Sequence, residues 1–90
     1  MKLMTVKPST RKNKKLVALF DDGKTIHFGP KDSQTYAEGA KKTKQINYLK
    51  RHKVNEDWSK INPGNLSRYI LWDQPSIKQG IAKFSFWIGL

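Results

Sequence analysis

The sequence predicts one small α+β domain, in which an N-terminal β-hairpin packs on about three short helices. Two β-prone runs, 16–20 and 25–28, flank Asp22-Gly23, and this dipeptide between apolar runs is a strong hairpin signal. Beyond Pro30 apolar residues recur at spacings of three and four, which is typical of helices. Ninety residues allow one domain at most.

Residues 1–14 are expected to form a basic arm. Four basic residues lie between Arg11 and Lys15, and Pro8 interrupts the few apolar side chains. Such a segment is either a disordered tail or an arm that becomes ordered on a partner. The hairpin is expected over residues 15–28. Because an isolated hairpin is only marginally stable, helices must cover one of its faces.

The first expected helix covers residues 40–53. Ile46 and Leu49 lie on its narrow apolar face, and lysines occupy the opposite face. A turn and a short helical piece are expected over residues 54–61, with Asn55 as the cap. The strongly basic outer face marks the first helix as a surface for acidic groups.

Two further helices are expected in the C-terminal third. Asn65 would cap a helix over 66–72, and Pro75 would begin the last helix. Gly80 weakens the last helix by about 1 kcal/mol relative to alanine. The domain therefore covers residues 15–83. The apolar stripe of the last helix consists of Ile77, Ile81, Phe84 and Ile88.

Aromatic and aliphatic groups make up the predicted core. Trp58, Trp72, His27 and Arg68 are given structural roles, and Arg68 is expected to pair with Glu56 or Asp57, because a half-buried arginine needs a partner. His52 is expected to stack on Trp58. The core residues are Leu16, Val17, Leu19, Phe20, Ile26, Phe28, Ile46, Leu49, Trp58, Leu66, Tyr69, Ile70, Trp72, Ile77 and Ile81.

The last segment, 84–90, is expected to be an apolar anchor that docks on another subunit, with core packing as the alternative. It is far shorter than the roughly 20 apolar residues that span a bilayer. The first ten residues lack the apolar stretch of a signal peptide. The anchor residues are Phe84, Phe86, Trp87, Ile88 and Leu90.

Positive charge dominates the composition. Eighteen Lys and Arg against seven Asp and Glu give a net charge of +11, and only three of the basic residues are Arg. Lysine suits phosphate backbones or acidic protein surfaces, whereas arginine is preferred for reading bases. The charge therefore predicts non-specific electrostatic contact. The predicted contact residues are Arg11, Lys12, Lys14, Lys15, Lys41, Lys42, Lys44, Lys50 and Arg51.

Motifs of catalysis are missing from the sequence. It has no Gly-x-Ser-x-Gly turn, no glycine-rich phosphate loop and no cysteine. His27 and His52 are the only histidines, and His52 with Glu56 is the only candidate metal pair. Two ligands do not make a metal site. We therefore expect no enzyme, no catalytic residue, no metal and no cofactor.

Four motifs follow one another along residues 15–83: His27-Phe28-Gly29, Tyr48-x-x-Arg51-His52, Glu56-x-Trp58 and Gly64-x-Leu66-Ser67-Arg68-x-x-Leu71-Trp72. Their order resembles a family of short basic proteins from nucleocytoplasmic large DNA viruses. That family has no assigned activity, so the resemblance implies no catalytic residues. It implies a viral source and a virion location. The segment 30–45 matches the family poorly.

Two function hypotheses follow. The first is a non-enzymatic structural virion protein, a minor capsid or capsid-associated component that binds neighbouring capsid subunits. It would be synthesised in the host cytoplasm or the viral factory. The alternative is a basic nucleic-acid-binding or genome-condensing viral protein without sequence specificity. A host-factor adaptor is a third possibility that the sequence does not test.

Overall fold

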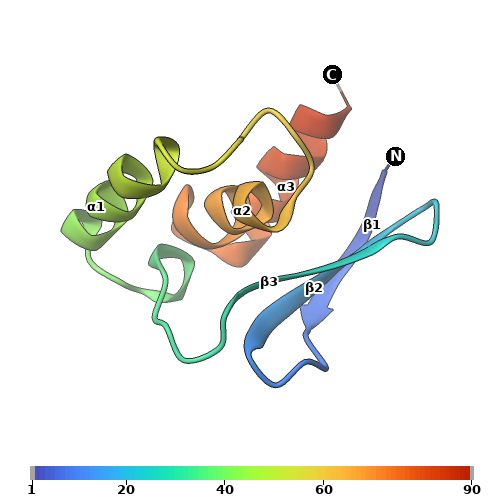
Figure 1. The fold of residues 1–90 in the computed structure, drawn as a ribbon, viewed down its shortest axis with the longest axis horizontal. Coiled ribbons are helices and arrows are strands. Elements are labelled where there is room, and N and C mark those ends of the chain that lie inside the picture. Colours follow the sequence, from blue (N-terminus) through green and yellow to red (C-terminus); the bar gives the residue numbers. More distant parts are fainter. Residues whose placement is uncertain (1, 90) are drawn as a thin grey trace.

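A computed structural model describes residues 2–89, and it has the expected α+β class (Figure 1). Within these residues three antiparallel strands form a sheet in the order β1-β2-β3. The helical block α2–η2–α3 lies between the sheet and α1 (Figure 1). The elements are β1 (Leu3–Pro8), β2 (Lys14–Phe20), β3 (Thr25–Pro30), the 3-10 turn η1 (Tyr36–Glu38), α1 (Lys42–Lys53), α2 (Pro63–Leu66), the π-helical η2 (Ser67–Trp72) and α3 (Ile77–Ile88).

The predicted hairpin is confirmed. Strands β2 and β3 pair with Leu16 opposite Phe28 and Ala18 opposite Ile26. Gly23 in the connecting turn has a φ of 85°, a conformation that glycine adopts without the steric cost of a side chain. The Asp-Gly signal therefore placed the turn correctly.

The prediction of an arm over residues 1–14 is wrong, because most of this segment belongs to the sheet. Strand β1 pairs with β2, with Val6 opposite Ala18. Leu3 and Val6 pack against the core, which gives the strand an apolar side to bury. A third strand also stabilises what would otherwise be a marginal hairpin.

The core lies between one face of the sheet and the helices η2 and α3. Phe28 and Ile70 have no exposed surface. Phe84 meets the rings of Phe20 and Tyr69 edge to face, at centroid distances of 6.5 and 5.7 Å, a geometry that stabilises beyond the buried area. Every predicted core residue except Ile46 is buried or half-buried.

Ile46 contradicts the prediction, since 51% of it is exposed. Helix α1 instead turns Gln45 and Tyr48 inward. The amide of Gln45 donates hydrogen bonds to the carbonyls of Trp72 and Asp73, at 2.9 and 3.1 Å. A buried carbonyl without a donor costs about 1–3 kcal/mol. The inward position therefore suits a glutamine better than an isoleucine.

Two predictions about helix starts are also wrong. Residues 54–61 form turns and bends in place of a short helix. Asn62, and not Asn65, caps α2, because the Asn62 side-chain oxygen accepts a hydrogen bond from the Asn65 backbone N–H at 2.8 Å. Pro63 then occupies the first turn, where its missing N–H costs nothing. Pro63 therefore lies in the first turn of α2, directly after the Asn62 cap.

The apolar segment 84–90 is mostly part of α3. Phe84 is fully buried, Trp87 and Ile88 pack against the core, and Phe86 is 72% exposed. Leu90 lies outside the described residues. The predicted stripe of α3 is confirmed. Phe84 is part of the core, so the alternative of core packing, and not the docking anchor, describes this residue. Within residues 2–89, no helix has the length and apolarity to cross a membrane.

Gly80 marks the close crossing of α3 over η2. It is buried, and a Cβ at this position would lie 2.6 Å from both the Ile70 Cα and the Tyr69 carbonyl oxygen. Both obstacles are backbone atoms, which cannot rotate away. The glycine is therefore required by the packing of two helices, whatever it costs in helix propensity.

We predict that Gly80→Ala lowers the free energy of unfolding by about 2–3 kcal/mol, the usual cost of overpacking. Helix propensity alone predicts a gain of about 1 kcal/mol. Urea denaturation followed by circular dichroism measures the difference. As a control, Ala82→Gly on the exposed side of α3 should cost about 1 kcal/mol. A Gly80→Ala protein as stable as the parent would show that the crossing is loose.

Candidate functional site

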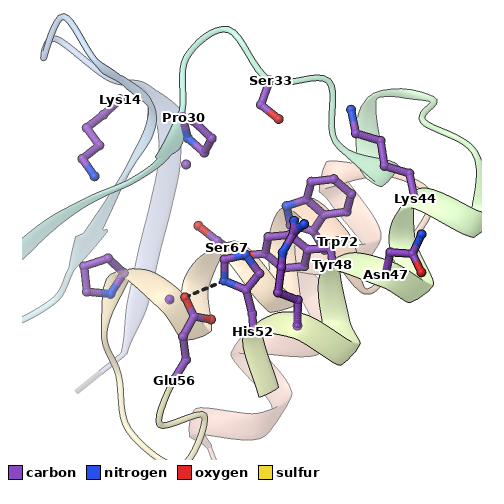
Figure 2. A pocket seen from close by; sticks show the side chains of 14 residues that line it. Lys14, Pro30, Ser33, Lys44, Asn47, Tyr48, His52, Glu56, Ser67 and Trp72 are labelled. Atoms are coloured by element: carbon purple, nitrogen blue, oxygen red, sulfur yellow. Dashed lines mark hydrogen bonds and ion pairs between the residues drawn. The ribbon is translucent and has the colours of Figure 1, made fainter. Parts of the chain in front are cut away.

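A cleft of about 550 Å³ opens between α1, the end of β3 and the start of α2 (Figure 2). Its walls come from β2, β3, α1, α2, η2 and the segments 31–35 and 54–62, which only the fold brings together. Its lining residues are Lys14, Gly29, Pro30, Ser33, Lys44, Asn47, Tyr48, Arg51, His52, Glu56, Pro63, Gly64, Ser67 and Trp72.

Three rings stack along one wall of the cleft. The indole of Trp72 lies parallel to the Tyr48 ring, with centroids 4.2 Å apart and planes 7° apart. The His52 imidazole covers the other end of this pair, 4.0 Å from Tyr48 at 20°. The ammonium of Lys44 lies 6.0 Å from the Trp72 ring centroid, a cation–π distance. Helix α1 is thus joined to η2 by ring faces.

Helical spacing explains how these side chains reach one wall. Lys44, Tyr48 and His52 are four residues apart on α1 and therefore share a face. Ser67 and Trp72 are five apart on η2, where hydrogen bonds join residues five apart; the Asp73 N–H donates to the Arg68 carbonyl at 2.8 Å. A π-helical turn often occurs at a functional site. Here it turns both residues to the cleft.

Positive charge exceeds negative charge around the cleft. Lys14, Lys44 and Arg51 line it, and Glu56 is the carboxylate among the lining residues. This carboxylate accepts hydrogen bonds from Trp58 Nε1 at 3.0 Å and pairs with His52 Nδ1 at 3.1 Å (Figure 2). His52 and Trp58 therefore partly compensate the negative charge of Glu56. The cleft as a whole favours an anion.

Two ionisable groups beside the cleft respond to their surroundings. Burial, and then the nearby charge of Glu56, raises the pKa of the Tyr48 hydroxyl. Tyr48 therefore remains a neutral hydrogen-bonding group. Partial burial, and then the charges of Arg11 and Lys14, lowers the pKa of His27. The positive potential thus extends from the cleft to the β1–β2 turn.

Two glycines bring backbone close to the cleft. Gly29 has a φ of 81°, and a Cβ there would lie 2.6 Å from Leu71 Cδ1. At Gly64 a Cβ would lie 2.8 Å from the carboxyl carbon of Glu56. Side chains at these positions would clash with a core leucine or displace the acid. Gly29 and Gly64 therefore allow Leu71 and Glu56 to pack directly against the backbone.

The Trp72 side chain leaves one polar atom unused. Trp72 is 3% exposed, and its Nε1 has no hydrogen-bond partner among residues 2–89. A buried donor without an acceptor costs about 1–3 kcal/mol. Figure 2 shows this nitrogen on the side of the indole that faces the cleft. An acceptor on a bound molecule would satisfy it.

Only part of the predicted basic set meets at the cleft. Lys14, Lys44 and Arg51 line it. Lys15 pairs with Glu38 at 2.9 Å, and Lys42 lies over the Tyr36 ring. The remaining predicted residues are exposed on α1 or on the β1–β2 turn: Arg11, Lys12, Lys41 and Lys50.

The residues predicted to be structural have different partners from those expected. Arg68 pairs with neither acid; its guanidinium lies 4.2 Å from the Tyr69 ring centroid and 5.0 Å from that of Trp58. Glu56 is occupied by His52 and Trp58, so ring faces receive the arginine. His52 stacks on Tyr48 and not on Trp58. His27 hydrogen-bonds the Ser9 hydroxyl at 2.6 Å.

Sequence reasoning missed Asn47, Ser33 and Ser67 as cleft residues. A signal existed for Asn47, which precedes Arg51 by four positions and so lies beside it on α1. Nothing in the sequence marked Ser33 or Ser67, because their position depends on how separate elements pack. The His52–Glu56 pair considered for a metal does form. Among residues 2–89, no three potential ligands gather into a metal cluster.

Comparison with known proteins identifies a family. A model described as "Family of unknown function (DUF5754)" matches residues 4–52, more than half of the chain. The chain belongs to this family. The DUF5754 match covers the sheet, η1 and all but the end of α1, including Tyr48 and His52, whereas Trp72 lies outside it. No curated protein and no solved structure matches the chain.

We predict that acid weakens the fold through His27. Its folded-state pKa lies below the ordinary value of about 6.5, so the unfolded chain binds more protons between the two values. Stability therefore rises with pH across this window and is lost as the pH falls below about 6.5. Thermal unfolding of His27→Gln should show a weaker pH dependence than the parent between pH 7 and 5. Arg11→Gln should give an intermediate slope, and identical slopes would contradict the assignment.

Proposed function

We propose that this DUF5754 protein is a non-enzymatic nucleic-acid-binding protein that holds the phosphate backbone without reading base sequence. The observation that carries the proposal is the cleft, where Lys14, Lys44 and Arg51 surround an aromatic wall. Basic grooves combined with ring faces are typical of proteins that bind single strands. The net charge of +11 supplies attraction over a longer range.

The distribution of charge supports backbone contact. Lys41, just before α1, extends the basic surface beyond the cleft, and Arg11 and Lys12 extend it along the β1–β2 turn. None of these side chains is held in a network that would position it for a base edge. Exposed lysines act on phosphates as point charges. Affinity should therefore depend on salt more than on sequence.

We predict that Arg51→Ala weakens binding to a random-sequence oligonucleotide. Loss of one phosphate contact should make the plot of log affinity against log salt less steep by about one unit. Fluorescence anisotropy between 50 and 200 mM salt measures the slope. Lys50→Ala is the matched control, because it removes the same charge from the adjacent exposed position outside the cleft. Its slope should change less.

Two outcomes would contradict the proposal. One is the absence of binding at 50 mM salt by a protein shown to be folded. The other is an equal change in slope for Arg51→Ala and Lys50→Ala, which would remove the cleft from the interface. Preference for one oligonucleotide sequence would contradict the backbone mode alone.

A second candidate function is a structural virion component of a large DNA virus, a minor capsid or capsid-associated protein that contacts neighbouring capsid subunits. Two exposed apolar side chains favour it, Phe86 at 72% and Met4 at 65%. Apolar groups of this size in contact with solvent are suited to protein partners. The basic residues would then face acidic protein surfaces. However, the segments first assigned to adhesive ends largely belong to β1 and α3, and Leu3, Val6, Phe84 and Trp87 contact the domain's own core, which favours nucleic acid.

The two candidates predict different locations in a purified virus particle. A capsid component should remain with the major capsid protein after gentle disruption, and a genome-binding protein should remain with the nucleic acid. Immunodetection in the separated fractions measures this. High salt should release the protein from the nucleic acid but not from apolar capsid contacts. Presence in neither fraction would contradict both locations.

A further inference from the structure

We propose that the cleft receives one unstacked nucleotide, with its aromatic base inside and its phosphate at the basic rim. This inference rests on the proposed nucleic-acid binding and adds a ligand class, unpaired over paired strands. A volume of about 550 Å³ lies within the range of about 300–1,000 Å³ that small-molecule pockets occupy. The cleft is thus of a size for one group and not for a double helix.

The walls suit a flat aromatic group. His52 ends the stack on Tyr48 and is half-buried, so its outer face is the ring surface offered to a base (Figure 2). Pro30 and Pro63 add apolar surface to the lining. Gly29 and Gly64 let Leu71 and the Glu56 carboxylate approach the backbone at two points of the lining. Bases inserted among rings gain stacking contacts of a kind that every base can make.

Polar groups inside the cleft match the edge of a base. The buried Trp72 Nε1 is a donor without an acceptor among residues 2–89. A ring nitrogen or carbonyl oxygen of a base can accept from it. Asn47 and Ser67 add groups that donate and accept, and Glu56 is an acceptor for an exocyclic amine. A phosphate could not satisfy this set, because Glu56 would repel it.

The charges fix the direction in which a nucleotide enters. Lys14 and Arg51 line the cleft from the sheet side and from α1, while Glu56 lies beside His52 and Trp58. The phosphate therefore belongs with the cations and the base with the rings. In a duplex the base is paired and stacked, so it cannot enter without being flipped out. Unpaired strands and free nucleotides are the two sources of this chemistry.

Abasic hexanucleotides test the proposal. A fluorescein-labelled deoxyadenosine hexanucleotide should bind at least about tenfold more tightly than the same backbone with abasic units, given what stacking contributes per base. Both ligands carry the same phosphates, so simple backbone binding predicts equal affinities. Equal affinities would overturn the nucleotide inference and leave backbone binding intact. Absence of binding by both ligands would overturn the proposed function as well.

Filling the cleft separates it from other base contacts. Asn47→Trp places a ring in the cleft at an exposed position and should abolish the tenfold difference while retaining abasic binding. Ile46→Trp, at the adjacent exposed position outside the cleft, should retain the difference. Ser33→Trp is a second filling variant should Asn47→Trp be unstable by thermal unfolding. A difference that survives both folded filling variants would overturn the proposal.

Competition identifies the source of the nucleotide. Adenosine monophosphate added to the labelled hexanucleotide complex should compete only at concentrations far above that of unlabelled hexanucleotide, if the source is a strand. Competition at equal concentrations would assign the cleft to free nucleotides. Failure of the monophosphate to compete at any concentration, together with equal binding of a fully paired duplex, would overturn the inference.

Discussion

The cleft depends on the way in which α1 is held against η2. The sequence of α1 is largely polar, and few of its side chains are buried. Two contacts compensate: the stacking of Tyr48 on Trp72 and the hydrogen bonds from Gln45 to the carbonyls of Trp72 and Asp73. Ring faces and a satisfied amide fix orientation more strictly than aliphatic packing does. These two contacts determine which face of α1 is turned toward the cleft.

The molecule thus combines a conventional core with a helix docked on it by polar and aromatic contacts. The sheet, η2 and α3 share the buried cluster around Phe28, Phe84 and Ile70, and α1 contributes Tyr48 to it. Lys44 and Arg51 of α1 line the cleft together with Lys14 of β2. An anion bound there would reduce the mutual repulsion of these cations. Binding and the docking of α1 should therefore support each other, as linkage requires.

Local signals were sufficient wherever one segment determined its own structure. Asp22-Gly23 defined the hairpin, and the stripe from Ile77 to Ile88 defined α3. Sequence-based prediction failed where contacts with residues far away in the chain determine the local structure. Leu3 and Val6 are too few to mark a strand until β2 offers an edge, and Gln45 displaces Ile46 from the interior because of carbonyls 27 and 28 residues away. The cleft could not be predicted, since its walls come from two strands, two loops and three helical elements.

Several residues of the four sequence motifs meet at the cleft. Tyr48 and His52 belong to one of these motifs and Trp72 to another, and the three rings form one continuous stack. Glu56 and Gly64 meet beside His52, where the absence of a side chain at Gly64 makes room for the carboxylate. Packing accounts for Trp72 and for the two glycines, which make room for Leu71 and Glu56, but not for the indole N–H of Trp72, which has no acceptor among residues 2–89. This N–H is explained if a ligand in the cleft supplies the acceptor, because an unsatisfied buried donor is a cost to an ordinary core.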